Sequence, residues 1–221
     1  MERLPSLHDV IPDVRSSQPA PRAKCRETGE AIQCAEGRQR AAIEGDVAGV
    51  NKNLPQFTAT MPVQVDKFAL KARIFFDITE QDQEAAKDAR EFYVICRKKI
   101  EEKGIFVLHD SFPEQDGSGF CLSHPLHPVI LINTKRQTRG RRLFTLGHEL
   151  GHVLMRKTGI SDPFVRENSV ETLCNRFAGA FFAPESFVLN LLGRRIEDDP
   201  DFDAVRWASR RLKISQEATV L

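Results

Sequence analysis

Apolar residues recur at helical spacing in a segment near the middle of the chain. Between Thr79 and Lys103 they follow one another at steps of three and four residues, at Ala85, Ala89, Phe92, Cys96 and Ile100. This spacing is typical of a helix that buries one face. Thr79 and Asp82 resemble a capping pair, and Gly104 is a typical C-terminal stop. The pattern therefore predicts one helix over residues 79–103.

Three short runs rich in β-branched and aromatic residues come next. They are Ile105–His109, Ser118–Ser123 and Pro128–Asn133, and turn residues such as Asp116 and Gly117 separate them. Runs of this composition and length are typical of strands. We therefore expect a small three-stranded sheet.

Two further helical patterns follow the strands, at about Thr138–Lys157 and about Glu167–Phe182. A turn with Gly159 and Pro163 separates them, and Pro184 ends the second because proline cannot continue a helix. The order helix, three strands, helix, helix lacks the regular alternation of parallel α/β proteins. The predicted fold class is therefore α+β, with the sheet packed against the two later helices.

The two ends of the chain differ from this central part. Between Arg15 and Gly49 the large aliphatic residues are only Ile32, Ile43 and Val47, so this stretch is expected to be disordered or loosely helical. Regular Phe, Leu, Ile and Val return from Leu54 onward. We therefore expect a poorly structured extension over residues 1–53, a folded domain over 54–190 and a helical C-terminal segment over 191–221.

The C-terminal segment predicts two short helices from Asp201 to Leu221, joined at Lys213–Ser215. Ser215 is a good N-cap for the second. Only six residues follow it, too few for a stable helix, so this helix is expected to be incomplete or frayed.

Composition narrows the class of protein. A formal net charge of +1 argues against a surface built as a whole for nucleic acid or acidic lipid. Five cysteines in no framework spacing indicate reduced thiols. No apolar run approaches the roughly 20 residues of a membrane span, and the first residues lack the pattern of a secretory signal. A cytoplasmic protein without a membrane partner is expected, and its oligomeric state is not indicated.

The segment Phe144–Met155 carries the main chemical signal. His148 and His152 are four residues apart, so on a helix they lie on one face, where both imidazoles can reach one tetrahedral ion. Glu149 lies beside them, where a carboxylate can take a proton from a water held by the metal. The rest of this helix is apolar, and two histidines and a glutamate buried without partners would be costly. The pattern therefore favours a zinc ion, Zn2+.

A peptidase zinc site needs a third protein ligand and one open position. Glu171 on the next helix is the favoured third ligand, and Glu167 on the same face is its rival. Asn175, one turn after Glu171, could hydrogen-bond a ligand histidine. Two other known arrangements fit poorly, because Thr158 stands where a third histidine would be needed and Asp162 lies in the turn.

Gly147 and Gly151 stand in the interior of the same helix, where each costs about 0.5–1 kcal/mol relative to alanine. We therefore expect a close approach of another part of the protein, or of substrate, to require glycine at these two positions. Two explanations stay open: packing against the sheet, or room for substrate or for the second metal-bearing helix.

Residues Arg141–Met155 and Val170–Glu185 together resemble the ImmA/IrrE family of zinc metallopeptidases. Members typically show Arg-x-Phe-Thr-x-x-His-Glu-x-x-His, then Glu-x-x-x-Asn-x-Phe-Ala and a short proline stop. The resemblance implies a gluzincin-like zincin core, with zinc on His148, His152 and Glu171 and with Glu149 as the catalytic base. It also implies a role in cleaving a partner transcriptional repressor, or in stress or mobile-element regulation. The tail is similar to the helix-turn-helix-like segment that follows the core in relatives.

Other candidates are less defined. An oxyanion could be stabilised by an arginine or by one of Tyr93, His109, His124 and His127, and nothing in the sequence selects among them. The basic run Lys135–Arg142 opposes the dipole of the helix that it begins, which leaves open a site for an acidic partner or a plain solvated run.

The favoured function is a zinc endopeptidase that cuts another regulatory protein. The first alternative is a regulatory or antitoxin-like protein in which zinc is structural. The second is a DNA-binding regulator that uses the cationic residues of the tail, and it is the less favoured of the two. Those residues are Arg206, Arg210, Arg211 and Lys213.

Overall fold

The computed structural model describes residues 28–44, 54–56, 62–156, 159–161, 169–193 and 202–215. In chain order its regular elements are α2 (Thr28–Glu44), α3 (Pro62–Phe75), α4 (Glu80–Ala85), α5 (Ala89–Glu102), β1 (Phe106–Asp110), β2 (Gly119–Leu122), β3 (Val129–Asn133), α6 (Arg139–Leu154), β4 (Gly159–Ser161), α7 (Ser169–Phe182), α8 (Glu185–Gly193) and α9 (Phe202–Leu212). The fold is α+β, as expected. Each helix in the described part of the chain is too short or too polar to cross a membrane.

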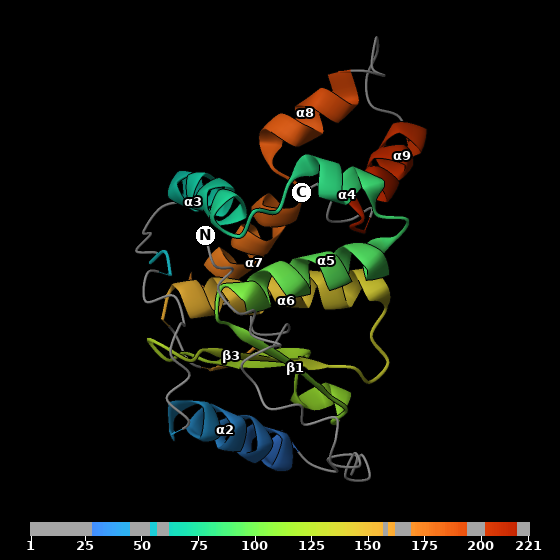
Figure 1. Cartoon of the computed structure of the whole chain (residues 1–221). Coiled ribbons are helices and arrows are strands. Elements are labelled where there is room, and N and C mark those ends of the chain that lie inside the picture. Colours follow the sequence, from blue (N-terminus) through green and yellow to red (C-terminus); the bar gives the residue numbers. More distant parts are fainter. Residues whose placement is uncertain are drawn as a thin grey trace.

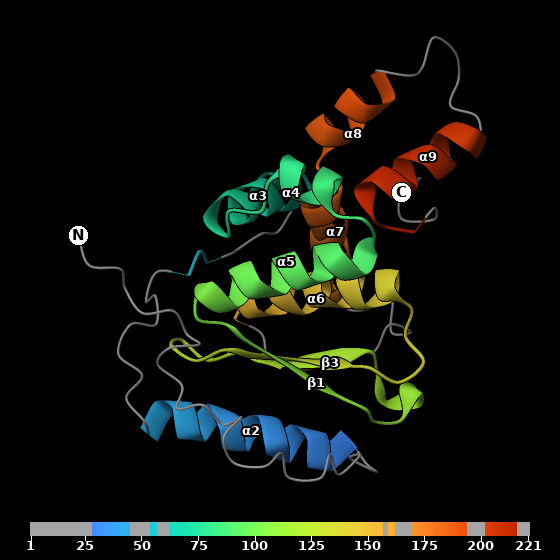
Figure 2. The same cartoon turned by 45° about the vertical axis from the view of Figure 1, so that its right-hand side comes forward.

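The elements form layers around the sheet (Figure 1). Helix α2 covers one face, and α5 and α6 cover the other. Helix α7 packs on α6 from the side away from the sheet, so the sheet lies against only the first of the two later helices, whereas both were expected to cover it. Helix α3 lies against α7, and α8 and α9 lie at the far end (Figure 2). The main hydrophobic core is continuous from α3 through α5 and α6 to α7, with Phe92, Leu146, Leu150, Phe177 and Phe181 fully buried.

The sheet has four strands in the order β1-β3-β2-β4, whereas three were expected. The three predicted strands are present: β1 is parallel to β3, and β2 is antiparallel to it. The additional strand, β4, pairs antiparallel with β2, with Gly119 opposite Ser161. It falls where the sequence predicted only a turn, because its three residues are too few to produce an alternating pattern.

The single helix expected over residues 79–103 is two helices, α4 and α5. The predicted capping pair is confirmed, because the Thr79 side chain accepts from the Asp82 backbone and Asp82 accepts from that of Thr79. The helix then stops, since Ala86 is extended and Asp88 caps a new helix by accepting from Arg90 N and Glu91 N. The apolar spacing continues across this break, so periodicity alone could not reveal it.

The N-terminal extension contains the regular helix α2, where disorder or loose helix was expected. Ala31 and Ala35 are fully buried against Phe112, Phe120 and Leu131 of the sheet layer. Gln39 Nε2 also donates to the carbonyl of His127 at 2.8 Å. The prediction of disorder was based on the small number of large aliphatic residues. Alanines, however, let the helix lie close enough to the sheet to bury the apolar face of the helix.

The tail contains the first of its two expected helices. Helix α9 packs on α8 through Ala208 and Leu212, which meet Phe187 and Leu191. Lys213 has a φ of 60° just after the helix ends. The second expected helix lies outside the described residues.

Candidate metal centre

Helix α6 carries the two histidines of the predicted motif. Thr138 begins the helix by accepting from Arg141 N at 3.2 Å, and Leu146, Leu150 and Leu154 anchor it in the core. The rings of His148 and His152 lie 4.9 Å apart between centroids, and both side chains are buried. The i, i+4 spacing therefore places them as the sequence predicted.

Helix α7 lies against α6 because two glycines allow it. A Cβ built at Gly147 would stand 2.5 Å from Phe182 Cε2, and one at Gly151 would stand 3.2 Å from Phe177 Cδ1. Both contacts are with α7, so of the two explanations left open, the close approach to the second helix is correct. This approach brings the first turn of α7, with Glu171, to the histidines.

His148, His152 and Glu171 converge on one point. The Nε2 atoms of the two histidines are 3.1 Å apart, and each lies 3.1 Å from an oxygen of the Glu171 carboxylate. These are the three residues, within the described ranges, whose possible ligand atoms gather within 4.8 Å of one another. The structure thus brings together three residues that the sequence singled out.

Asn175 orients one of the histidines. Its Oδ1 lies 2.9 Å from His148 Nδ1, on the side of the ring away from Glu171. An amide oxygen only accepts, so the Nδ1 proton is donated to it and Nε2 faces the carboxylate.

Charge within the cluster shifts two pKa values. Burial alone would lower the pKa of His148, but the hydrogen bond to Glu171 and the charge of Glu149 hold it above its ordinary value. Burial would likewise raise the pKa of Glu171, whereas its hydrogen bonds to His148 and His152 lower it to about 2. The carboxylate is therefore ionised throughout the physiological range.

This geometry suits a small divalent cation. Ligand atoms about 2.0–2.1 Å from a tetrahedral ion lie about 3.3–3.4 Å from one another, close to the separations of 3.1 Å seen here. Without a cation or a shared proton, two ring nitrogens and two carboxylate oxygens would bring lone pairs together in a buried place. Two imidazoles and one carboxylate are also a ligand set typical of metallopeptidases.

Glu149 is fully buried on the same helix, beside strand β2 of the sheet. A Cβ built at Gly119 of β2 would stand 3.2 Å from Glu149 Oε1 and 2.8 Å from Thr145 Cγ2. Glycine at 119 therefore lets the strand pass close to this carboxylate. The sequence analysis missed Gly119, although a glycine inside a strand is a known sign of close approach.

The remaining candidates lie apart from this cluster or outside the described residues. Thr158, Asp162 and the rival ligand Glu167 are outside them. Tyr93 and His109, on α5 and β1, hydrogen-bond to each other at 2.7 Å. His124 Nδ1 accepts from the backbone of Leu126 and His127, which builds the turn after β2. None of these four side chains belongs to the three-residue cluster.

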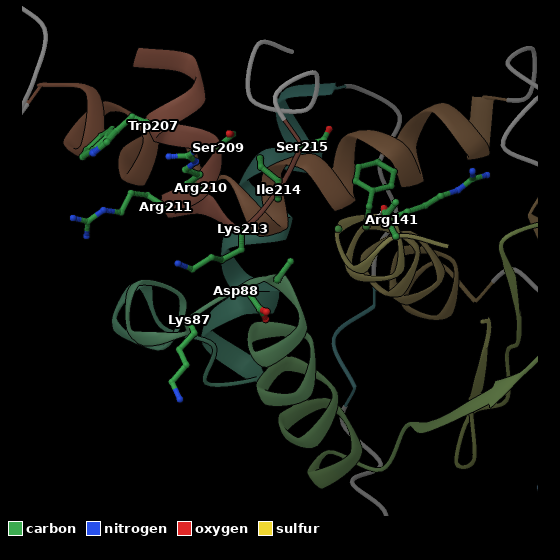
Figure 3. A pocket seen from close by; sticks show the side chains of 14 residues that line it. Lys87, Asp88, Arg141, Trp207, Ser209, Arg210, Arg211, Lys213, Ile214 and Ser215 are labelled. Carbon is green, nitrogen blue, oxygen red and sulfur yellow. Dashed lines mark hydrogen bonds between the residues drawn. The ribbon is translucent and has the colours of Figure 1, made fainter. Parts of the chain in front are cut away.

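The cationic residues of the tail line a pocket of about 960 Å³ between α9 and the N-terminal ends of α5 and α6. Arg210, Arg211 and Lys213 contribute to it, together with Lys87 and Arg141. Figure 3 shows the ends of Lys87, Arg141 and Arg211 directed away from one another. These charges therefore do not converge on a single ligand position.

Comparison with known proteins gives two matches. The IrrE N-terminal-like domain, a peptidase family, matches residues 100–220, which include the sheet, α6, α7 and the tail. The radiation response metalloprotease IrrE of Deinococcus radiodurans is 37% identical over 78 residues, which cover 32% of this chain and 24% of that protein. The chain thus matches about a quarter of the length of this curated relative. Because the family match extends over more than half of the residues, the chain belongs to the ImmA/IrrE family of metallopeptidases, through its IrrE N-terminal-like domain.

Proposed function

We propose that the protein is a zinc-dependent metalloendopeptidase that hydrolyses a peptide bond in a partner regulatory protein. The observation that carries the proposal is the convergence of His148, His152 and Glu171 beside a buried Glu149, in a chain of a metallopeptidase family. In this proposal the three converging residues are the zinc ligands. Zinc, when bound, supplies a Lewis acid for the scissile carbonyl and lowers the pKa of water.

Glu149 and Asn175 have different roles in this proposal: Glu149 transfers a proton, and Asn175 orients a ligand histidine. Glu149 takes a proton from the attacking water and passes it to the leaving nitrogen, which its position one residue after His148 allows. Asn175 accepts the Nδ1 proton of His148 and so keeps Nε2 free for the metal. Three protein ligands in the described cluster support a site with an open position, as catalysis needs, over a closed structural one.

The substrate is proposed to be a repressor-type transcription regulator that is cut at an exposed segment. Two points support it: the family resemblance, and the match to a relative that is named as a radiation response metalloprotease. We place the protein in the cytoplasm, because the cysteines Cys34, Cys96 and Cys174 are free thiols, as in a reducing compartment. We also propose residues 54–190 as the peptidase unit and 191–221 as a helical addition to it.

The Glu149→Gln variant tests the proposed base. It should keep the metal content of the wild type, since Glu149 is not a ligand, and lose about 10²–10⁴-fold in cleavage rate. Elemental analysis gives the metal content. Cleavage is followed by comparing new protein N-termini in cells that express the wild type or the variant.

Glu185→Gln is the matched control, because Glu185 is exposed in the first turn of α8. It should leave both metal content and cleavage unchanged. If the wild type and Glu149→Gln produced the same N-termini at the same rate, the assignment of the base would be wrong. If the wild type produced no new N-termini while holding zinc, the non-catalytic regulatory alternative would replace the enzyme.

A further inference from the structure

A second pocket lies between α5, the end of β1 and the start of α6, away from the metal cluster. Its volume is about 750 Å³, and Arg142 on its wall is about 9 Å nearer the start of α6 than His148. The wall carries one carboxylate, Glu101, and five cationic side chains, those of Arg90, Arg97, Lys98, Arg139 and Arg142. Glu101 already accepts from Arg97 at 2.9 and 3.0 Å, so cations remain in excess.

The first turn of α6 adds to this excess. Arg139 and Arg142 stand at the positive end of the helix dipole, where cations are unfavourable. Arg139 is paired with Asp88 at 2.7 Å, and Arg142 Nη2 donates to the Thr134 carbonyl. Arg142 Nε is buried and has no hydrogen-bond acceptor in the described part of the protein. An anion in the pocket would balance the excess of cationic side chains and would accept a hydrogen bond from Arg142 Nε.

Three hydrogen-bonded side chains, Arg97, His109 and Tyr93, leave the Tyr93 hydroxyl proton available to a ligand in this pocket. Arg97 Nη1 lies 3.2 Å from His109 Nδ1, and a guanidinium only donates, so Nδ1 must accept. Partial burial and the charges of Arg97 and Arg142 lower the pKa of His109 to about 4, so the ring is neutral and its proton is on Nε2. That proton is donated to Tyr93 Oη at 2.7 Å. The hydroxyl proton of Tyr93 is then left for another acceptor.

Gln137, by contrast, needs a hydrogen-bond donor from the ligand. Its side chain is 9% exposed, and its Nε2 donates to the Ser118 carbonyl at 2.8 Å, which fixes the orientation of the amide. Its Oε1 is buried and, among the described residues, receives no hydrogen bond. A ligand that satisfies this wall must therefore accept several hydrogen bonds and also donate one.

We propose that this pocket binds a partly protonated phosphate group, either inorganic phosphate or a phosphomonoester. Its anionic oxygens accept from Tyr93 Oη, Arg142 Nε and the surrounding guanidinium groups. Its P–OH group, or a hydroxyl of the ester, donates to Gln137 Oε1. Sulfate has the same charge as the monohydrogen phosphate dianion, but it has no proton at neutral pH. The site should therefore prefer phosphate over sulfate. The residues that carry these donors and this acceptor all line the same pocket.

The test is calorimetric titration of the full-length, metal-loaded chain with sodium phosphate, sodium sulfate and glycerol 2-phosphate at constant ionic strength. We expect one saturable site and a weaker affinity for sulfate. Tyr93→Phe, which removes only the hydroxyl, should lower phosphate affinity about tenfold, the loss of one hydrogen bond to a charged group. Tighter binding of glycerol 2-phosphate would identify an ester as the ligand, and tighter binding of phosphate would identify the free ion.

Arg90→Ala and Arg38→Ala form a matched pair, because both arginines are exposed and only Arg90 lines the pocket. Arg90→Ala should weaken phosphate binding severalfold, and Arg38→Ala should not. Thermal unfolding without phosphate checks that each variant is folded. Absence of binding at millimolar phosphate would overturn the proposal. So would binding that Tyr93→Phe and Arg90→Ala both leave unchanged, since phosphate would then be bound elsewhere, for example at the metal.

Discussion

Glu171 is the residue on which the proposed ligand set depends most, because it comes from a different helix than the two histidines. The Glu171→Ala variant should lose more than about 100-fold in zinc affinity, beyond the loss typical for removing a hydrogen-bond partner of a ligand. Competition with a chromophoric chelator measures this. Glu167→Ala is the control and should bind zinc as the wild type does. Reversal of the two results would make Glu167 the ligand.

Protonation of His148 should make metal binding depend on pH. In the metal-free protein, burial alone would lower its pKa, but Glu171 and Glu149 raise it above 6.5. Nε2 must lose its proton before it can bind a metal ion. Zinc affinity should therefore still be below its plateau at pH 6.5 and rise as the pH passes through the raised pKa. Calorimetric titrations across this range provide the measurement, and an affinity that is constant with pH would contradict the protonation of this ring.

At the residue scale, spacing along α6 was sufficient to predict the histidines, because i, i+4 geometry is local. The convergence of Glu171 was predicted only as one of two choices, since it depends on how two helices cross. Gly119 was missed because its significance lies in Thr145 and Glu149, which approach it from another element. Contacts between elements that are distant in sequence leave little trace in the local pattern.

At the scale of elements, the packing of α6 on α7 should be sensitive to single methyl groups. Gly147→Ala places a Cβ 2.5 Å from Phe182 Cε2, so it should destabilise the fold by about 1–3 kcal/mol. Urea unfolding measures the change, and zinc affinity should fall with it because α7 is displaced.

Gly179→Ala provides the control on the partner helix. Nothing lies within 4 Å of a Cβ at this position, so alanine should stabilise the helix by about 0.5–1 kcal/mol. Equal effects of the two substitutions would mean that helix propensity, and not the contact between helices, decides the stability at Gly147.

Element prediction succeeded where the signal was a repeated pattern and failed where it was a small local feature. The three predicted strands and the helices α6 and α7 are present. The break at Ala86–Asp88 was missed because one N-cap, Asp88, outweighs a periodicity that runs on across it. Helix α2 was underestimated because its buried face is made of alanines, and the short β4 has no pattern of its own.

At the scale of the whole molecule, Gln83 joins elements that are far apart in sequence. Its side chain is fully buried and accepts from Arg73 Nη1 of α3 at 2.9 Å. Its Nε2 donates to the carbonyls of Phe182 at 2.7 Å and Leu212 at 2.6 Å, which are the C-terminal ends of α7 and α9. The tail is thereby tied to the helix that carries Glu171.

Gln83→Leu should therefore destabilise the protein by at least about 2 kcal/mol, because the carbonyls of Phe182 and Leu212 lose this donor and the buried Arg73 guanidinium keeps only the Phe181 carbonyl as a hydrogen-bond acceptor. Chemical denaturation measures the loss, and hydrogen exchange should show it at the ends of α7 and α9. Gln81→Leu is the control, since Gln81 is exposed on the same helix and should change stability little. If both substitutions changed the stability by a similar small amount, the hydrogen bonds of Gln83 would contribute nothing to the stability of the fold.

The close contact of α6 with α7 has a consequence for the choice of metal. Because Phe177 and Phe182 meet the backbone of α6 at Gly151 and Gly147, folding itself sets the spacing of the three proposed ligands, before any ion arrives. Ions with bonds near 2 Å can then enter and leave without rebuilding the helices. Calcium, which needs about 2.3–2.6 Å to each oxygen, would have to force the two helices apart. We therefore expect this close crossing to select ions by size, so that the protein discriminates against large cations even when they are abundant.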